Sequence, residues 1–233
     1  MQQPAPAAQG RREEAKAERR RRIIHAAREL IRETGDAGLS MRALAARAGV
    51  SLATPYNLFG SKGAILLAVL EDIKGFGRRF GGYEACSPLD RVLKAAALAV
   101  SYYEQDPDFY RALWGSMLRT TGAEERSMIF NPKREAFWIG LLDAAAGEGW
   151  LLPEIDTATL MLNLDFTFRS VMLHWINGEI GLESLQPGVG YGYALTLRGA
   201  ATDKGRQLML ERALAFQAEL APARAARSGS RPD

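Results

Sequence analysis

The helical spacing of the apolar residues places the strongest constraint on the fold. Apolar side chains return every three or four residues along most of the chain, and alternating strand-like runs are scarce. Ala, Leu, Arg and Glu, which favour helices, are abundant. With 47% hydrophobic residues among 233, the chain has enough apolar side chains to bury a core. The sequence therefore predicts an all-α fold.

Three serines and two glycines indicate where the first helices begin and end. Ser40, Ser51 and Ser61 each precede a short apolar stripe, and a serine oxygen there accepts an amide of the first helical turn. Gly35 and Gly49 stand where helices should end. The first helix is expected over 12–34. Later helices, with caps at Asn131 and Asp156, are expected over 89–106, 108–121, 132–147, 156–177, 183–201 and 202–220.

A glycine-rich stretch over 75–82 predicts a domain boundary. We expect a DNA-binding domain over 12–74, a linker over 75–88 and an effector-binding and dimerisation domain over 89–221. The two ends, 1–11 and 222–233, are rich in Ala, Pro, Ser, Gly and Arg. Because they offer little to bury, we expect both to be disordered tails.

The positive charge is concentrated near the N-terminus. From Arg11 to Lys62 there are twelve Lys/Arg and six Asp/Glu, whereas the whole chain carries a formal charge of only +3. This asymmetry is expected when one domain binds a polyanion. A single cysteine, Cys86, excludes an intrachain disulfide. With no signal peptide and no apolar run of about 20 residues, we expect a soluble, cytoplasmic protein that does not associate with a membrane.

Catalytic chemistry has few candidate residues. The two histidines, His25 and His174, fall in different predicted domains. The glycines over 188–192 lack both the preceding strand and the following Lys-Ser/Thr of a phosphate-binding loop. We therefore expect neither an enzyme nor a protein with a cofactor or a metal ion.

Two short helices joined by a glycine turn in a basic segment are typical of a helix-turn-helix, whose second helix enters the major groove. Ser40 and Arg42 lie at a helix start, where amides and a guanidinium bind phosphate. Thr54, Tyr56 and Asn57 place hydroxyl and amide groups on the second helix. The stretch Ser40–Lys62 closely resembles the signature of the tetracycline-repressor (TetR) family, and the resemblance extends over about 20–70, including the helix before Gly35.

This resemblance implies a homodimeric, ligand-responsive transcription regulator, usually a repressor, with a variable helical effector domain. It places base contacts around Ser51–Asn57 and phosphate contacts at Ser40, Arg42, Tyr56 and Lys62. The DNA-binding residues predicted in this way are Ser40, Arg42, Ser51, Leu52, Ala53, Thr54, Tyr56, Asn57 and Lys62. Pro55 and Leu58 depart from the family pattern. Because Pro55 disfavours helical geometry at Thr54, the second helix should start late or be tightly wound.

The run Arg19–Arg22 has two interpretations. It is either a solvated helix face or a contact to the DNA backbone.

The second predicted domain is rich in aromatic residues and methionine at helical spacing. Ordinary core packing explains any one of them, but together they favour an apolar ligand pocket with a few polar groups. The candidate ligand-binding residues are Tyr103, Tyr110, Trp114, Met117, Phe137, Trp138, Asp165, Phe166, Arg169 and Met172. Asp165 and Arg169, spaced i, i+4, would form an intrahelical ion pair or orient an anionic ligand.

The expected 156–177 helix is apolar on nearly all sides, which a surface helix of a monomer would not be. Together with the last helix it would form an intersubunit four-helix bundle, using the stripe Leu208, Met209, Ala213, Leu214 and Phe216. We therefore expect a dimeric repressor that binds a palindromic operator in double-stranded DNA and is released by a small, mostly apolar ligand. An activator and a factor regulated by a protein partner remain open alternatives.

Overall fold

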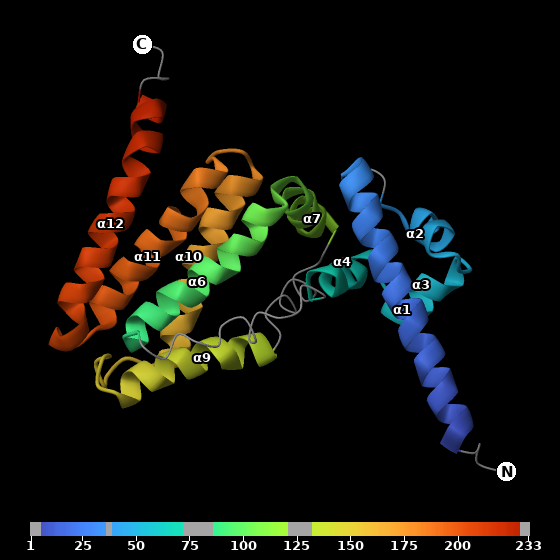
Figure 1. The fold of residues 1–233 in the computed structure, drawn as a ribbon, viewed down its shortest axis with the longest axis horizontal. Coiled ribbons are helices and arrows are strands. Elements are labelled where there is room, and N and C mark those ends of the chain that lie inside the picture. The colour runs from blue at the N-terminus through green and yellow to red at the C-terminus, as the bar shows by residue number, and fades with distance from the viewer. Residues whose placement is uncertain (1–5, 36–38, 72–85, 121–131, 229–233) are drawn as a thin grey trace. The chain divides into compact units, whose positions relative to one another are not determined.

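A computed structural model describes residues 6–35, 39–71, 86–120 and 132–228, all of which are helices and their connections (Figure 1). These ranges contain no strand, and one isolated bridge pairs Leu151 with Ala201. The predicted all-α class is confirmed. None of the helices in these ranges is long and apolar enough to cross a bilayer.

The chain divides into two compact units. The first comprises the described residues of Met1–Lys74 and Asp108–Ile129. It holds α1 (Pro6–Thr34), α2 (Met41–Ala48), α3 (Ala53–Phe59) and α4 (Lys62–Glu71), together with α7 (Pro107–Thr120). From the sequence we instead expected α7 to be part of the effector-binding and dimerisation domain, 89–221. Residues 75–85 of the predicted linker, 75–88, lie outside the described residues. Its last residue, Pro88, is the first residue of the next helix.

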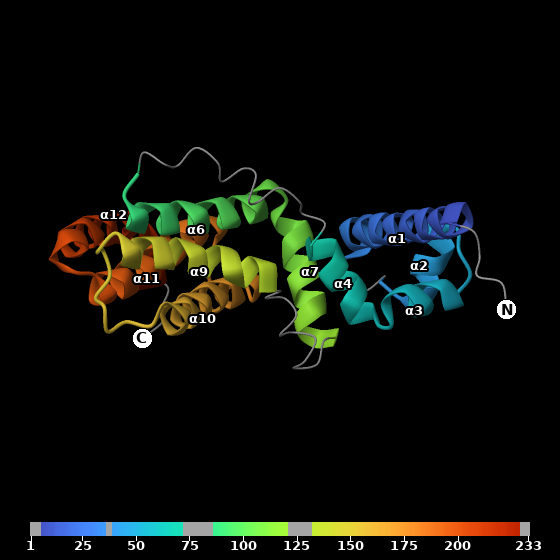
Figure 2. The ribbon, with the colours of Figure 1, turned by 90° about the horizontal axis from the view of Figure 1, so that it is seen from below.

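The second unit is a bundle of longer helices. It contains α6 (Pro88–Gln105), α9 (Pro132–Gly147), α10 (Thr157–Ile176), a 3-10 turn (Leu182–Ser184), α11 (Leu185–Ala200) and α12 (Asp203–Ser228). Helix α11 packs against α6, α10 and α12, and α9 packs against α6 and α10 (Figure 2). The fully buried side chains of the second unit include Trp175, Tyr193 and Leu164, so its core contains both aromatic and aliphatic groups.

Several predicted caps are present. The Ser40 hydroxyl accepts the Ala43 amide at 3.1 Å, and the Ser61 hydroxyl accepts the Ala64 amide at 3.0 Å. The Asp156 carboxylate accepts hydrogen bonds from the Thr159 hydroxyl at 2.6 Å and the Thr159 amide at 2.8 Å, and these bonds hold the pKa of Asp156 below its usual range. Asn131, the other predicted cap, lies outside the described residues. These groups satisfy amides that a helix start leaves unpaired.

The prediction of two disordered tails is wrong in part. Helix α1 already begins at Pro6, which suits a proline at the first helical position. Helix α12 runs to Ser228 through Pro222. Pro222 is exposed, so water can satisfy the carbonyl that proline leaves unpaired, and the alanines around it are strong helix formers.

Three glycines over 188–192 of helix α11 leave space for side chains of its neighbours. A Cβ at Gly190 would lie 2.5 Å from Cζ of Phe216 on α12, and one at Gly192 would meet the Thr167 methyl group on α10. The glycines over 188–192 are therefore positions of close helix packing.

Candidate nucleic-acid interface

The helix-turn-helix rests on a small apolar core within the first unit. Ile23 of α1, Leu44 of α2 and Ile65 of α4 are completely buried. Between α2 and α3 the chain reverses at Gly49, whose φ of 62° suits a residue without a side chain. The Gly49 amide donates to the carbonyls of Ala45 and Ala46, and closes α2. The turn between the two short helices is therefore fixed by backbone geometry.

Helix α3 starts one residue later than a cap at Ser51 requires, so the prediction of that cap is wrong. Leu52 occupies the capping position without a side-chain bond, and the Ser51 hydroxyl instead contacts the Thr54 hydroxyl at 2.9 Å. The Thr54 amide donates to the Ser51 carbonyl at 2.9 Å, which makes a tight first turn. Pro55 is buried in that first turn, where an amide would have no partner within the helix. The late, tight start expected from Pro55 is thus present.

One face of α3 is open to solvent. Leu52, at the capping position, is 47% exposed and Tyr56, on the helix, is 50% exposed, which is an unusual exposure for two large side chains so close together. Ser51, Ala53 and Asn57 are also exposed, whereas Thr54 is half-buried. The face combines small residues with one amide and one phenol. It can approach a surface closely and still offer donors and acceptors.

Three of the four predicted phosphate-binding residues lie at two helix starts of the same unit, and the fourth, Tyr56, lies within α3. Ser40 and Arg42 are exposed at the beginning of α2, and Lys62 is half-buried as the first residue of α4. Unpaired amides and the helix dipole favour an anion at such positions. The structure thus places all nine predicted DNA-binding residues in the first unit, on α2, α3, the start of α4 and the turns between them.

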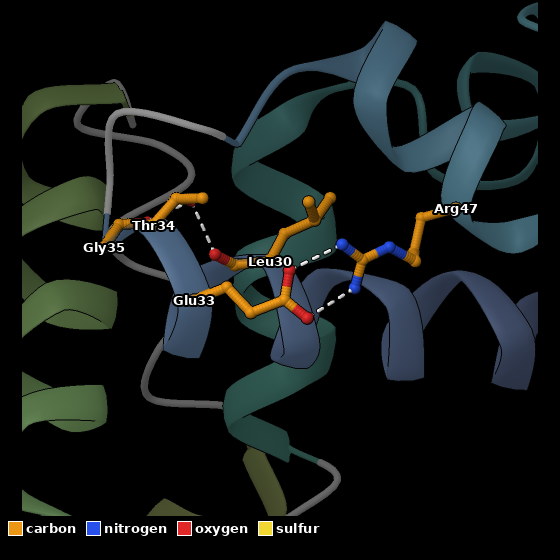
Figure 3. A network of polar contacts seen from close by, with 5 residues as sticks. All are labelled: Leu30, Glu33, Thr34, Gly35 and Arg47. Carbon is orange, nitrogen blue, oxygen red and sulfur yellow. Dashed lines mark hydrogen bonds and ion pairs between the residues drawn. The ribbon is translucent and has the colours of Figure 1, made fainter.

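Arg47, also on α2, binds a carboxylate of α1. Its guanidinium donates two hydrogen bonds to the Glu33 carboxylate of α1, at 2.8 Å and 2.5 Å (Figure 3). This contact holds the pKa of Glu33 below its usual range and raises that of Arg47. Nearby, the Thr34 hydroxyl donates to the Leu30 carbonyl at 2.6 Å where α1 ends (Figure 3). The pair fastens α2 to the end of α1.

Sequence reasoning missed the contact between Arg20 and the end of α3. The Arg20 guanidinium donates to the Leu58 carbonyl at 3.1 Å and lies 4.2 Å from the centre of the Phe59 ring. Phe59 is half-buried under this cation. The run Arg19–Arg22 gave no signal that one of its members would bind α3.

The candidate ligand residues are divided between the two units. Tyr110, Trp114 and Met117 belong to α7 of the first unit. In the second unit the Tyr103 ring lies 6.2 Å from Trp175 and 6.3 Å from Phe168, and Trp138 lies 5.7 Å from Phe137 and 6.5 Å from Tyr193. Met172 is buried in that unit as well.

Two of the candidates face outward. Phe166 is 58% exposed, so the structure does not bring it to the interior. Arg169 is exposed too, and its Nε lies 2.6 Å from Oδ2 of the buried Asp165. The i, i+4 ion pair is therefore formed. Burial and the nearby Asp165 carboxylate raise the pKa of Tyr193.

Residues 23–69 match a family model described as bacterial regulatory proteins of the tetR family. Similar solved structures include full-length TylP, a tetR regulator from Streptomyces fradiae, at 21% identity, covering 89% of this chain and 92% of that one with a TM-score of 0.54. A TetR regulator from Rhodococcus sp. RHA1 is 24% identical, with coverages of 79% and 97% and a TM-score of 0.58.

A third similar structure is NalD, the secondary repressor of the MexAB-OprM multidrug efflux pump in Pseudomonas aeruginosa. It is 18% identical, with coverages of 81% and 99% and a TM-score of 0.57. At such identities these likenesses establish the fold. No functionally curated protein matches the sequence.

Proposed function

Because residues 23–69 match the model of the tetR family of bacterial regulatory proteins, we propose that the chain is a cytoplasmic, dimeric repressor of that family rather than an enzyme. It reads a palindromic operator with α3 and leaves the DNA when a small, mostly apolar ligand binds. The observation that carries the proposal is the exposed face at α3, on a domain that matches the family model; its exposed residues are Ser51, Leu52, Ala53, Tyr56 and Asn57.

In this proposal α3 enters the major groove and the starts of α2 and α4 hold the backbone. Asn57 and Tyr56 supply the groups that face the bases, because their side chains are exposed on the open face of α3. Arg42 supplies a phosphate contact at the start of α2. Two-fold operator binding requires two copies of α3 about 34–36 Å apart, one turn of DNA.

Binding is tested by fluorescence anisotropy with a duplex that the wild-type chain selects from a pool of random cores, and with a shuffled duplex of the same composition. We expect tighter binding of the selected duplex by at least about 1,000-fold. Equal affinity for both duplexes would contradict the proposal.

A matched pair of variants on α2 tests the backbone contact. Arg42→Gln and Arg47→Gln each remove one exposed cation, but Arg47 is paired with Glu33. Arg42→Gln should flatten the slope of log affinity against log salt by about 0.9 for each phosphate that is no longer neutralised, or about 1.8 for a symmetric dimer. Arg47→Gln should leave the slope unchanged. Equal flattening by both variants would show that net charge, rather than the position of Arg42, sets the slope.

The dimer is supported by an exposed apolar face in the second unit. Leu162, Phe166 and Leu173 on α10 are 51%, 58% and 45% exposed and share one side of the helix. Leu195 on the adjacent α11 is 43% exposed. Surface apolar residues gathered in this way are typical of an interface with another protein. We assign the intersubunit bundle to α10 and α11.

The last helix is less suited to that bundle than the sequence predicts. Met209 and Ala213 of its stripe are buried within the chain's own unit, and Phe216 packs over Gly190 of α11. Leu214, at 52% exposure, is therefore a matched control. Phe166→Glu and Leu195→Glu should give monomers in analytical ultracentrifugation, whereas Leu214→Glu should remain dimeric. If Leu214→Glu were the only one of the three variants to give monomers, the interface would lie on α12.

The ligand is proposed to bind among the aromatic side chains of the second unit, around Tyr103, Trp138 and Trp175. Their large apolar surfaces suit a hydrophobic ligand. NalD, which represses a multidrug efflux pump, offers a precedent for a regulator of this fold in drug export. A thermal-shift screen of hydrophobic compounds should find one that raises the melting temperature by linkage and also lowers DNA affinity. A compound that binds while DNA affinity is unchanged would contradict release.

A further inference from the structure

The N-terminal half of α1 extends beyond the core of its unit. Every residue from Gly10 to Arg22 is exposed, and the next side chain, that of Ile23, is buried. At 1.5 Å per residue this exposed part of the helix is about 20 Å long. The three-helix core therefore does not need it for packing.

Three cations of this exposed half line one side of the helix. Arg12, Lys16 and Arg19 follow one another at i, i+4 and i+3, so they form a single stripe along the helix, which we call the α1 stripe. The same spacing leads from Arg19 to Ile23, which packs in the core. The helix face that is apolar and buried after Ile23 is thus cationic and open before it.

Two of the three acidic residues in this stretch lie away from the stripe. At about 100° per residue, Glu14, Glu18 and Arg21 fall on the opposite side of α1, and Arg21 is about 200° from Arg19. Arg21 forms an ion pair with Glu18 there. Lys16 is the member of the stripe that lies near a carboxylate, with Glu13 at 4.0 Å. Arg12 and Arg19 have no ion-pair partner within the described ranges.

Such a stripe opposes helix formation. A solvated helix face is stabilised by opposite charges at i and i+4, and like charges at that spacing destabilise it by a similar amount. A polyanion lying along the stripe reverses that effect, since it interacts with three cations in a row.

Arg20 shows which part of the unit the stripe borders. It follows Arg19 directly and reaches the Leu58 carbonyl and the Phe59 ring at the end of α3. The cationic half of α1 therefore starts beside the proposed reading helix and continues away from it. A ligand that runs past the end of α3 can reach the stripe, and duplex DNA is such a ligand.

We propose that the α1 stripe binds the phosphate backbone of duplex DNA that flanks the bases contacted by α3. This inference rests on the proposed function and adds a second, sequence-independent DNA contact to it. It predicts that affinity depends on DNA beyond the recognised bases.

The test uses the full chain and a selected duplex, prepared with and without 15-bp arms of fixed sequence on each side. Anisotropy is measured across a potassium chloride series for the wild type and for the triple variant Arg12→Gln, Lys16→Gln and Arg19→Gln. Removing the arms should weaken wild-type binding and flatten its salt slope. The triple variant should lose about 0.9 in slope per phosphate contact, up to about 5 for a symmetric dimer, and should no longer respond to the arms.

Arg19→Gln and Arg21→Gln are a matched pair. Both remove one cation from the same exposed stretch of α1, on opposite sides, and Gln and Arg have similar helix propensities. Only Arg19→Gln should flatten the slope. Circular dichroism should show equal helix content for both variants.

The outcomes separate the two claims. If the wild-type chain enriches no sequence from the pool, the proposed function fails. If it enriches a sequence but the triple variant keeps the wild-type slope and response to the arms, the α1 stripe does not bind DNA. An equal effect of Arg19→Gln and Arg21→Gln would overturn the assignment to one face. Unchanged DNA binding together with weaker binding of phosphatidylglycerol vesicles would assign the stripe to a membrane surface instead.

Discussion

Replacing Gly190 with alanine tests how closely α11 and α12 pack. The new Cβ would lie 2.5, 2.6 and 2.7 Å from three atoms of the Phe216 ring, well inside van der Waals contact. Forcing the ring or the helix to move costs about 1–3 kcal/mol. Alanine also favours the helix over glycine by about 0.5–1 kcal/mol, which offsets part of that cost.

Gly140→Ala on α9 is the matched control, because nothing lies within 4 Å of its Cβ position and the residue is exposed. It gains the same helix propensity without the clash, so it should stabilise the protein. The two variants should therefore differ by the packing term alone, about 1–3 kcal/mol in unfolding free energy. For a chain of this size that is about 2–4 °C in melting temperature per kcal/mol.

Urea unfolding followed by circular dichroism measures both variants and a double-mutant cycle with Phe216→Ala. Removing the ring should cost less in the Gly190→Ala background than in the wild type, since it also relieves the clash. If Gly190→Ala is as stable as Gly140→Ala, α12 does not lie against α11 as described, and the reasoning fails.

Three further predictions concern stability. Gly49→Ala should destabilise the first unit by about 1–2 kcal/mol in urea unfolding, because φ is 62° there and the nearest atom, Nη1 of Arg22, is 3.9 Å from the Cβ position, so strain and not a clash is the cause. Arg47 lowers the pKa of Glu33, so the ion pair stabilises the folded protein at pH values above the ordinary carboxyl pKa. This contribution is lost as the pH falls through the lowered pKa. The gap in melting temperature between wild type and Glu33→Gln should close in acid, and a constant gap would contradict this. Burial raises the pKa of Tyr193, so the folded state resists its ionisation and stability should fall above about pH 10, less so in Tyr193→Phe.

Local rules predicted most of the helix starts. The caps at Ser40, Ser61 and Asp156 depend on a side chain and an amide three residues away, which the sequence places directly. Ser51 does not act as a cap, because its hydroxyl contacts the hydroxyl of Thr54 instead of a backbone amide of the first turn.

Features that depend on distant parts of the chain were harder to predict. Gly190 and Gly192 of α11 leave space for Phe216 and Thr167, and nothing near the two glycines in sequence indicates this. Phe166 lies on the outer face of a helix that is apolar on nearly all sides, so periodicity gave no sign of which side is buried. The link between Arg20 and α3 joins residues 38 positions apart.

The central claim is that the open face of α3 reads bases, and Asn57→Ala tests it most directly. The measurement is the ratio of affinities for the selected and the shuffled duplex, in the wild type and in the variant at one salt concentration. One good base contact is worth about 1–3 kcal/mol, so the ratio should fall about 5-fold to 150-fold for each of the two contacts that a symmetric dimer loses, while binding of shuffled DNA is unchanged. An equal drop in affinity for both duplexes would contradict base reading by α3.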